Sequence, residues 1–179
     1  MTSINVQFKG VKQFQKALAQ TKSKVEKKAQ QALNRTLTRS RTQMTNAIGE
    51  KLNLKKKTIR ELISLKKANK HTGLIGKLIV KNKPVSLIEY KAKQNRKGVS
   101  FRIFKDRPRQ LIKHAFITPN SRQQETVFKR ETKARLRIKP LYGTRVTDVA
   151  GDKLKTTKRF ALDFLVKEIN RLLALKTKG

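Results

Sequence analysis

Apolar residues recur along the first third of the chain in two different periods. Residues 4–8 alternate apolar with polar side chains, which is typical of a short half-buried strand. From residue 11 the apolar positions recur every three or four residues, with no proline or glycine in the interval. This pattern predicts a helix over residues 11–48, about 55 Å long, that ends at Gly49.

A helix of that length is hard to cover within a chain of 179 residues. Part of its apolar stripe, formed by Leu33, Leu37 and Met44, is therefore expected to contact another subunit. In the alternative, the chain's own sheet covers the whole stripe. The sequence leaves both interpretations open.

The middle of the chain, over residues 63–140, is predicted to be rich in strands. A two-turn helix over residues 55–63, with Ile59, Leu62 and Ile63 on one side, comes just before it. The segment KAKQNRKGVS, which ends with Gly98 and its two following residues, is typical of a basic hairpin turn. Short segments rich in β-branched or aromatic residues are predicted as strands over residues 74–80, 85–90, 99–104, 114–118, 126–130 and 134–138. No gap between them admits a crossover helix, so the strands should form an antiparallel meander.

Helical periodicity returns at the C-terminal end. Asp152 is a plausible N-cap, and apolar residues then recur at helical spacing, which predicts a helix over residues 152–175. The order of elements indicates an α+β fold. A long N-terminal amphipathic helix and a C-terminal helix would pack on an antiparallel β-sheet, in a single domain over residues 1–179.

The chain has a large excess of basic over acidic residues. Lys and Arg number 46 against 11 Asp and Glu, which gives a net charge of +35. The bases occur throughout the segments with regular apolar periodicity, whereas a disordered nucleic-acid tail would concentrate them at one end. Self-repulsion on this scale opposes compaction, so a polyanion, salt or an acidic neighbouring subunit should stabilise the fold.

Two segments carry the densest positive charge, and lysine predominates in both. Lysine is a point charge that suits phosphates, whereas arginine reads guanine with two hydrogen bonds, so a nucleic-acid contact should be non-specific and salt-dependent. The candidate residues for binding nucleic acid or an acidic partner are Lys55, Lys56, Lys57, Arg60, Lys66, Lys67 and Lys70 in the first group, and Lys91, Lys93, Arg96 and Lys97 in the second.

Catalytic chemistry has little support. The chain has no Cys and two His, His71 and His114, so thiolate sites are excluded and a histidine zinc site is improbable. Three acid-x-Lys pairs of the kind that metal-dependent nucleases use begin at Glu26, Glu89 and Glu131, but chance alone would place about as many. The segment HTGLIGK lacks the spacing of a phosphate-binding loop. We therefore expect no enzyme activity, catalytic residue, metal or cofactor.

Several segments resemble a known family. INVQFKGVKQFQKAL, QALNRTLTRSRTQM, LNLKKKTIR and ARLRIKPLYGTRVTDVAG are similar to the minor tail protein Z family of long-tailed bacteriophages, also called tail completion proteins. The most characteristic piece is an aliphatic-Pro-Leu-x-Gly motif, here Ile138, Pro140, Leu141 and Gly143. The family often has proline where this chain has Thr144.

The resemblance implies a structural virion protein at the head-proximal end of the tail, where it completes the tail for head–tail joining. It implies a homo-oligomeric ring, often sixfold, around the DNA channel, with the tail terminator, tail tube, head–tail connector and phage DNA as partners, assembled in the bacterial host cytoplasm. The chain's N-terminus lacks a signal peptide, and no apolar run is long enough for a membrane span. A ribosomal or other non-sequence-specific RNA-binding protein is the alternative function.

Overall fold

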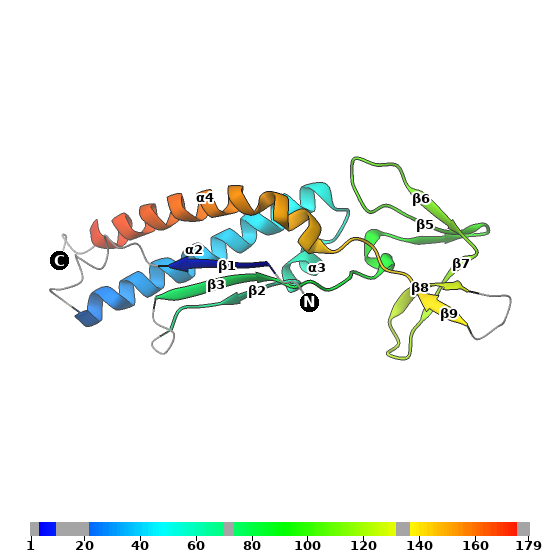
Figure 1. Cartoon of the computed structure of the whole chain (residues 1–179), viewed down its shortest axis with the longest axis horizontal. Coiled ribbons are helices and arrows are strands. Elements are labelled where there is room, and N and C mark those ends of the chain that lie inside the picture. The colour runs from blue at the N-terminus through cyan, green and yellow to red at the C-terminus, as the bar shows by residue number, and fades with distance from the viewer. Residues whose placement is uncertain (1–3, 10–21, 70–73, 132–136, 175–179) are drawn as a thin grey trace.

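The computed structural model describes residues 4–9, 22–69, 74–131 and 137–174. Two long antiparallel helices lie over one three-stranded sheet, and two further small sheets lie at the opposite end of the elongated molecule (Figure 1). The fold is therefore α+β, as predicted. The helices are α2 (Lys22–Lys51), α3 (Lys56–Glu61), the 3₁₀ helix η2 (Leu87–Tyr90) and α4 (Val146–Ala174). The strands are β1 (Ile4–Lys9), β2 (Ile63–Lys66), β3 (Ile75–Val80), β4 (Lys93–Asn95), β5 (Gly98–Phe101), β6 (Gln110–Lys113), β7 (Ala115–Pro119), β8 (Glu125–Arg130) and β9 (Ile138–Pro140).

Helices α2 and α4 pair along their length in opposite directions. Near one end, Nζ of Lys28 donates to the carbonyl oxygen of Leu172 at 3.3 Å. At the other end, Lys51 and Asp152 form an ion pair of 3.2 Å.

Among the residues that the structure describes, none of the helices combines the length and the hydropathy of a membrane span.

Both predicted helix boundaries next to glycine are wrong. Helix α2 continues through Gly49 to Lys51, and residues 11–21 of the predicted helix lie outside the described residues. Helix α4 begins at Val146, so Asp152 is not its N-cap. Val146 and Val149 are buried. A Cβ added at Gly151 would have no neighbouring atom within 4 Å. Burial of this first turn therefore extends the helix beyond the start that the capping pattern indicated.

The first sheet has the strand order β1-β3-β2, and both pairs are antiparallel. Side chains alternate between the two faces of β3, and Leu78 and Val80 are buried under the helices. Gly76 lets α2 approach closely, because a Cβ at this position would overlap Cδ1 of Leu37. Leu33, Leu37 and Met44 are at most 3% exposed. The chain's own core therefore covers them, and the predicted contact of these three residues with another subunit is wrong.

The other two sheets are antiparallel, in the orders β4-β5-β6 and β7-β8-β9. They confirm the antiparallel pairing, and the basic hairpin turn connects β4 to β5. The segment 85–90 is not a strand, because its last four residues form η2 and bury Leu87 and Tyr90. The predicted two-turn helix stops at Glu61, and Ile63 starts β2. Most of the predicted strand 134–138 lies outside the described residues.

The loop that follows β5 attaches these sheets to the C-terminal end of α2. The backbone N–H of Lys105 donates to the carbonyl oxygen of Lys51 at 2.9 Å, and that of Asn53 donates to Ile103 at 2.8 Å. Nζ of Lys105 also donates to the carbonyl oxygen of Gly49. The two bonds from Lys105 satisfy carbonyl groups at the end of α2, where a positive charge is also favourable.

Candidate nucleic-acid interface

The first basic group surrounds α3 and the end of β2. Ile59 is fully buried and fixes α3 against α2, which turns Lys56, Lys57 and Arg60 towards solvent. Lys55 precedes the helix, Lys66 ends β2 and Lys67 follows it, and all three are exposed. Lys70 lies outside the described residues. Six of the seven predicted bases therefore lie on the surface.

The second basic group lies on the sheets at the opposite end of the molecule. Lys91 follows η2 in a left-handed conformation with φ of 53°. Lys93 lies in β4, and Arg96 and Lys97 form the turn to β5. All four are exposed. The two basic groups therefore occupy different elements, although Lys55 of the first group and Lys91 of the second line the same cleft.

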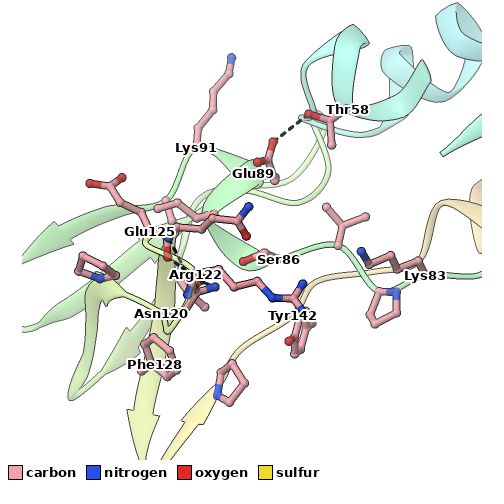
Figure 2. Close-up of a pocket in the computed structure, with 18 of the residues that line it drawn as sticks. Thr58, Lys83, Ser86, Glu89, Lys91, Asn120, Arg122, Glu125, Phe128 and Tyr142 are labelled. Atoms are coloured by element: carbon pink, nitrogen blue, oxygen red, sulfur yellow. Dashed lines mark hydrogen bonds between the residues drawn. The ribbon is translucent and has the colours of Figure 1, made fainter. Parts of the chain in front are cut away.

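A cleft of about 1450 Å³ lies where the two groups come closest, between α3, η2, the β7–β8 turn and β9. Figure 2 shows Thr58 and Glu89 on one side of it, joined by a 2.8 Å hydrogen bond in which the Thr58 hydroxyl donates. Its charged lining residues are of both signs: Lys55, Lys83, Lys91 and Arg122 are basic, and Glu61, Glu89 and Glu125 are acidic. The cleft is thus less suited to a polyanion than the open basic surfaces. Sequence reasoning missed Lys83 and Arg122, because isolated bases give no local signal.

Some bases serve the fold instead of a ligand. Nε of Arg102 donates to the carbonyl oxygen of Phe104 at 3.3 Å. Nη2 of Arg109 donates to the carbonyl oxygens of Lys91 and Ser100, both at 2.9 Å. These side chains fix the loop between β5 and β6 and neighbouring segments, so the total charge overstates the number of bases that are free to bind.

The acid-x-Lys pairs were candidates for a metal site. Glu131 forms an ion pair of 3.7 Å with Lys139, whereas Lys133 lies outside the described residues. In the described part of the chain, no group of three or more His, Asp or Glu side chains is placed to hold a metal ion. His114 is exposed in the turn between β6 and β7, with φ of 59°, and His71 is outside the described residues.

The aliphatic-Pro-Leu-x-Gly motif joins β9 to η2. The backbone N–H of Leu141 donates to Val127, and that of Gly143 donates to Val85, both at 2.8 Å. In the same segment, Ile138 and Pro140 line the cleft. The motif residues therefore hold two elements together.

Tyr90 completes this junction. Its ring is fully buried against Gly143, and its hydroxyl donates to the carbonyl oxygen of Thr144 at 2.6 Å. Burial, with the nearby charge of Asp148, raises the pKa of Tyr90 well above its usual value, so the hydroxyl stays protonated as a donor. Proline at position 144 would supply the same carbonyl acceptor.

These features define an α+β protein with exposed basic surfaces on an ordered scaffold. Comparison with protein-family models, with curated proteins and with solved structures finds no match for this chain.

Proposed function

We propose that the chain is a non-enzymatic structural protein of a long-tailed bacteriophage virion, which completes the head-proximal end of the tail for head–tail joining. In this proposal, copies of the chain form a ring, and Lys55–Lys57 with the neighbouring bases contact the DNA that passes through it. The contact is with phosphates and is independent of base sequence.

The observation that supports this function is the excess of exposed bases on an ordered fold. Within the described parts of the chain, the bases in ion pairs include Arg35, Lys51, Lys139 and Arg171. The full chain has 11 Asp and Glu, which are too few to neutralise its bases. The chain has 46 bases. Duplex DNA carries about one negative charge per 1.7 Å of its axis, so it provides a dense counter-charge. Genome passage also requires a contact that attracts DNA without selecting a sequence.

The DNA contact is tested by binding short duplexes of unrelated sequence over a range of salt concentrations. We expect equal affinities for the duplexes and a steep linear fall of log K with log salt. Replacing Lys55, Lys56 and Lys57 together with Glu should weaken binding at least tenfold and reduce the salt slope by about 2 to 3, because three phosphate contacts are lost.

A matched control changes the net charge equally at another surface. Lys155, Lys158 and Lys167 are exposed on α4, and their replacement with Glu should reduce affinity much less. Equal losses in the two triple variants would mean that net charge, and not the surface around α3, determines binding.

The virion assignment has its own test in the genes that flank this one. Tail-tube and tape-measure genes beside it would support the proposal, whereas ribosomal or RNA-processing genes would favour the alternative of an RNA-binding protein. A nuclease would degrade duplex DNA when Mg²⁺ is added, and we expect no such loss.

A further inference from the structure

Strand β2 has a free edge in the described part of the molecule. It is at the end of the order β1-β3-β2 and forms the lower rim of that sheet in Figure 1. The backbone N–H of Lys81 donates to the carbonyl oxygen of Leu62 at 2.8 Å. This bond determines which residues of β2 direct their backbone groups towards β3. Because bonded positions alternate in an antiparallel pair, Ser64 pairs with β3, whereas Ile63 and Leu65 direct their backbone groups away from it.

Each edge of the sheet β7-β8-β9 carries a protective feature at one outward position. In β9 the outward position 140 is a proline, which has no N–H to offer to a further strand. In β7 the outward N–H of Ile117 donates to Oε1 of Gln94 at 2.8 Å. Within the described residues, β2 has neither a proline nor a side-chain acceptor at its outward positions.

A groove of about 890 Å³ runs along this edge. Residues 63–67 form one wall, and Arg41 of α2 and Arg60 of α3 contribute to the others. Arg41, Arg60, Lys66 and Lys67 make the groove strongly positive, and among its described lining residues Glu61 alone is acidic. Nε of Arg41 is buried and has no hydrogen-bond partner among the described residues. The positive lining of the groove, rather than this buried atom, is what suits carboxylates.

The strand is also held rigid for a partner. Just beyond β2, Nδ2 of Asn34 donates to the carbonyl oxygen of Ala68 at 3.0 Å, and its Oδ1 accepts from the Ala68 N–H at 2.9 Å. Nε2 of Gln30 donates to the same carbonyl at 2.7 Å. These contacts anchor the end of the strand to α2. The strand would therefore lose little conformational entropy when a partner binds at its edge.

We propose that an extended acidic segment of a neighbouring protein adds to the free edge of β2 as a fourth strand, with its carboxylates on the bases of the groove. Unpaired backbone donors and acceptors in a row match another polypeptide strand, while a nucleic-acid phosphate can accept hydrogen bonds but offers no matching N–H. The inference rests on the proposed function for an acidic neighbour in the assembled particle, and it places that neighbour beside the DNA contact, because Arg60, Lys66 and Lys67 of the first basic group line the groove.

The test uses an end-capped seven-residue peptide of alternating glutamate and valine, with the full-length protein. Binding should slow hydrogen exchange of the Ile63 and Leu65 amides, measured by NMR, while those of Ser64 and Lys66 act as internal references because β3 already pairs them. The same peptide with alternate backbone amides N-methylated keeps all its charges but cannot pair on its methylated edge. It should bind at least tenfold more weakly.

A pair of variants tests the charge contribution. R41A should weaken binding of the unmodified peptide about tenfold, because Arg41 lines the groove. R39A, at an exposed position on the same helix outside the groove, should leave the affinity unchanged.

Three results would overturn the inference: equal binding of the two peptides, no binding of either, or displacement of the bound peptide by a duplex that protects the same amides. The last result would identify the groove as a nucleic-acid site. The proposed function fails separately, if duplex DNA binds without salt dependence while the peptide still adds to β2.

Discussion

The carboxylate of Glu168 lies almost buried between the two long helices, with 8% of its side chain exposed. Its Oε1 accepts hydrogen bonds from Arg35 at 2.6 Å and from Arg171 at 2.7 Å, and Oε2 accepts one from Arg171 at 3.0 Å. The hydrogen bond from Arg171 first, then that from Arg35, outweigh desolvation and lower the pKa of Glu168 from 4.5 to about 2. The ionised group therefore stabilises the contact of α2 with α4.

Replacing Glu168 with Gln should lower the free energy of unfolding by about 2 to 3 kcal/mol at neutral pH. Since the folded-state pKa of Glu168 is below the ordinary value of 4.5, its stabilisation is complete above that pH and is lost as the pH falls towards 2. The difference between wild type and variant should thus shrink over this range. Urea unfolding at neutral pH and at about pH 3 measures it.

Glu131 provides the control, because its 3.7 Å ion pair with Lys139 joins two exposed side chains. Its replacement with Gln should change stability by less than about 0.5 kcal/mol. Equal losses in the two variants, or an E168Q difference that does not depend on pH, would contradict the assigned role of Glu168.

At the scale of elements, long periodic segments could be predicted and their ends could not. The apolar stripes identified both long helices, because a period of three and four repeated over many turns has few alternatives. Their ends depend on contacts made by residues distant in the chain. Gly49 stays helical where it packs against Ile59, and burial of Val146 starts α4 early.

Short elements and the detailed use of charge were less predictable. Residues 85–90 have the composition of a strand, yet contacts of Tyr90 with the β9 segment favour a 3₁₀ helix. Exposure of the lysines around α3 followed from the sequence, since a dense basic run rarely lies in a core. The hydrogen bond from Lys105 to the carbonyl oxygen of Gly49 could not be predicted from the sequence, because the two residues are 56 positions apart in the chain.

The junction of β9 with η2 permits a test of close packing. A methyl group on Gly143 would come within 3.0 Å of Cζ of Tyr90, and closer still to two other ring carbons. Because the buried ring has little freedom to move, G143A should lower stability by about 1 to 3 kcal/mol. In α4, a methyl group on Gly151 would have no neighbouring atom within 4 Å, so G151A should raise stability by about 0.5 to 1 kcal/mol.

Thermal unfolding of the two variants measures these opposite shifts. A stable G143A would show that the β9 segment is not held against Tyr90 as described. Since Gly143 belongs to the aliphatic-Pro-Leu-x-Gly motif, the result also tells whether that motif is structural.

At the scale of the whole molecule, net charge and shape act together. The elongated arrangement in Figure 1 separates the helical end from the small sheets, which spreads the positive charge over a larger surface than a sphere would offer. Buried apolar residues from both ends nevertheless belong to one core cluster, which includes Leu37 of α2 and Val127 of β8. Burial of this shared core stabilises the fold against the mutual repulsion of the bases along the chain.

Salt should therefore stabilise this protein. Raising the ionic strength from about 0.01 M to 0.1 M shortens the Debye length from about 30 Å to about 10 Å, so repulsion between distant bases is screened. Screening also weakens the ion pairs, but these are few beside a net charge of +35. We expect the melting temperature in sodium chloride to rise by roughly 5 °C over this range, measured by calorimetry. A melting temperature that stayed constant or fell would show that local ion pairs dominate over the net charge.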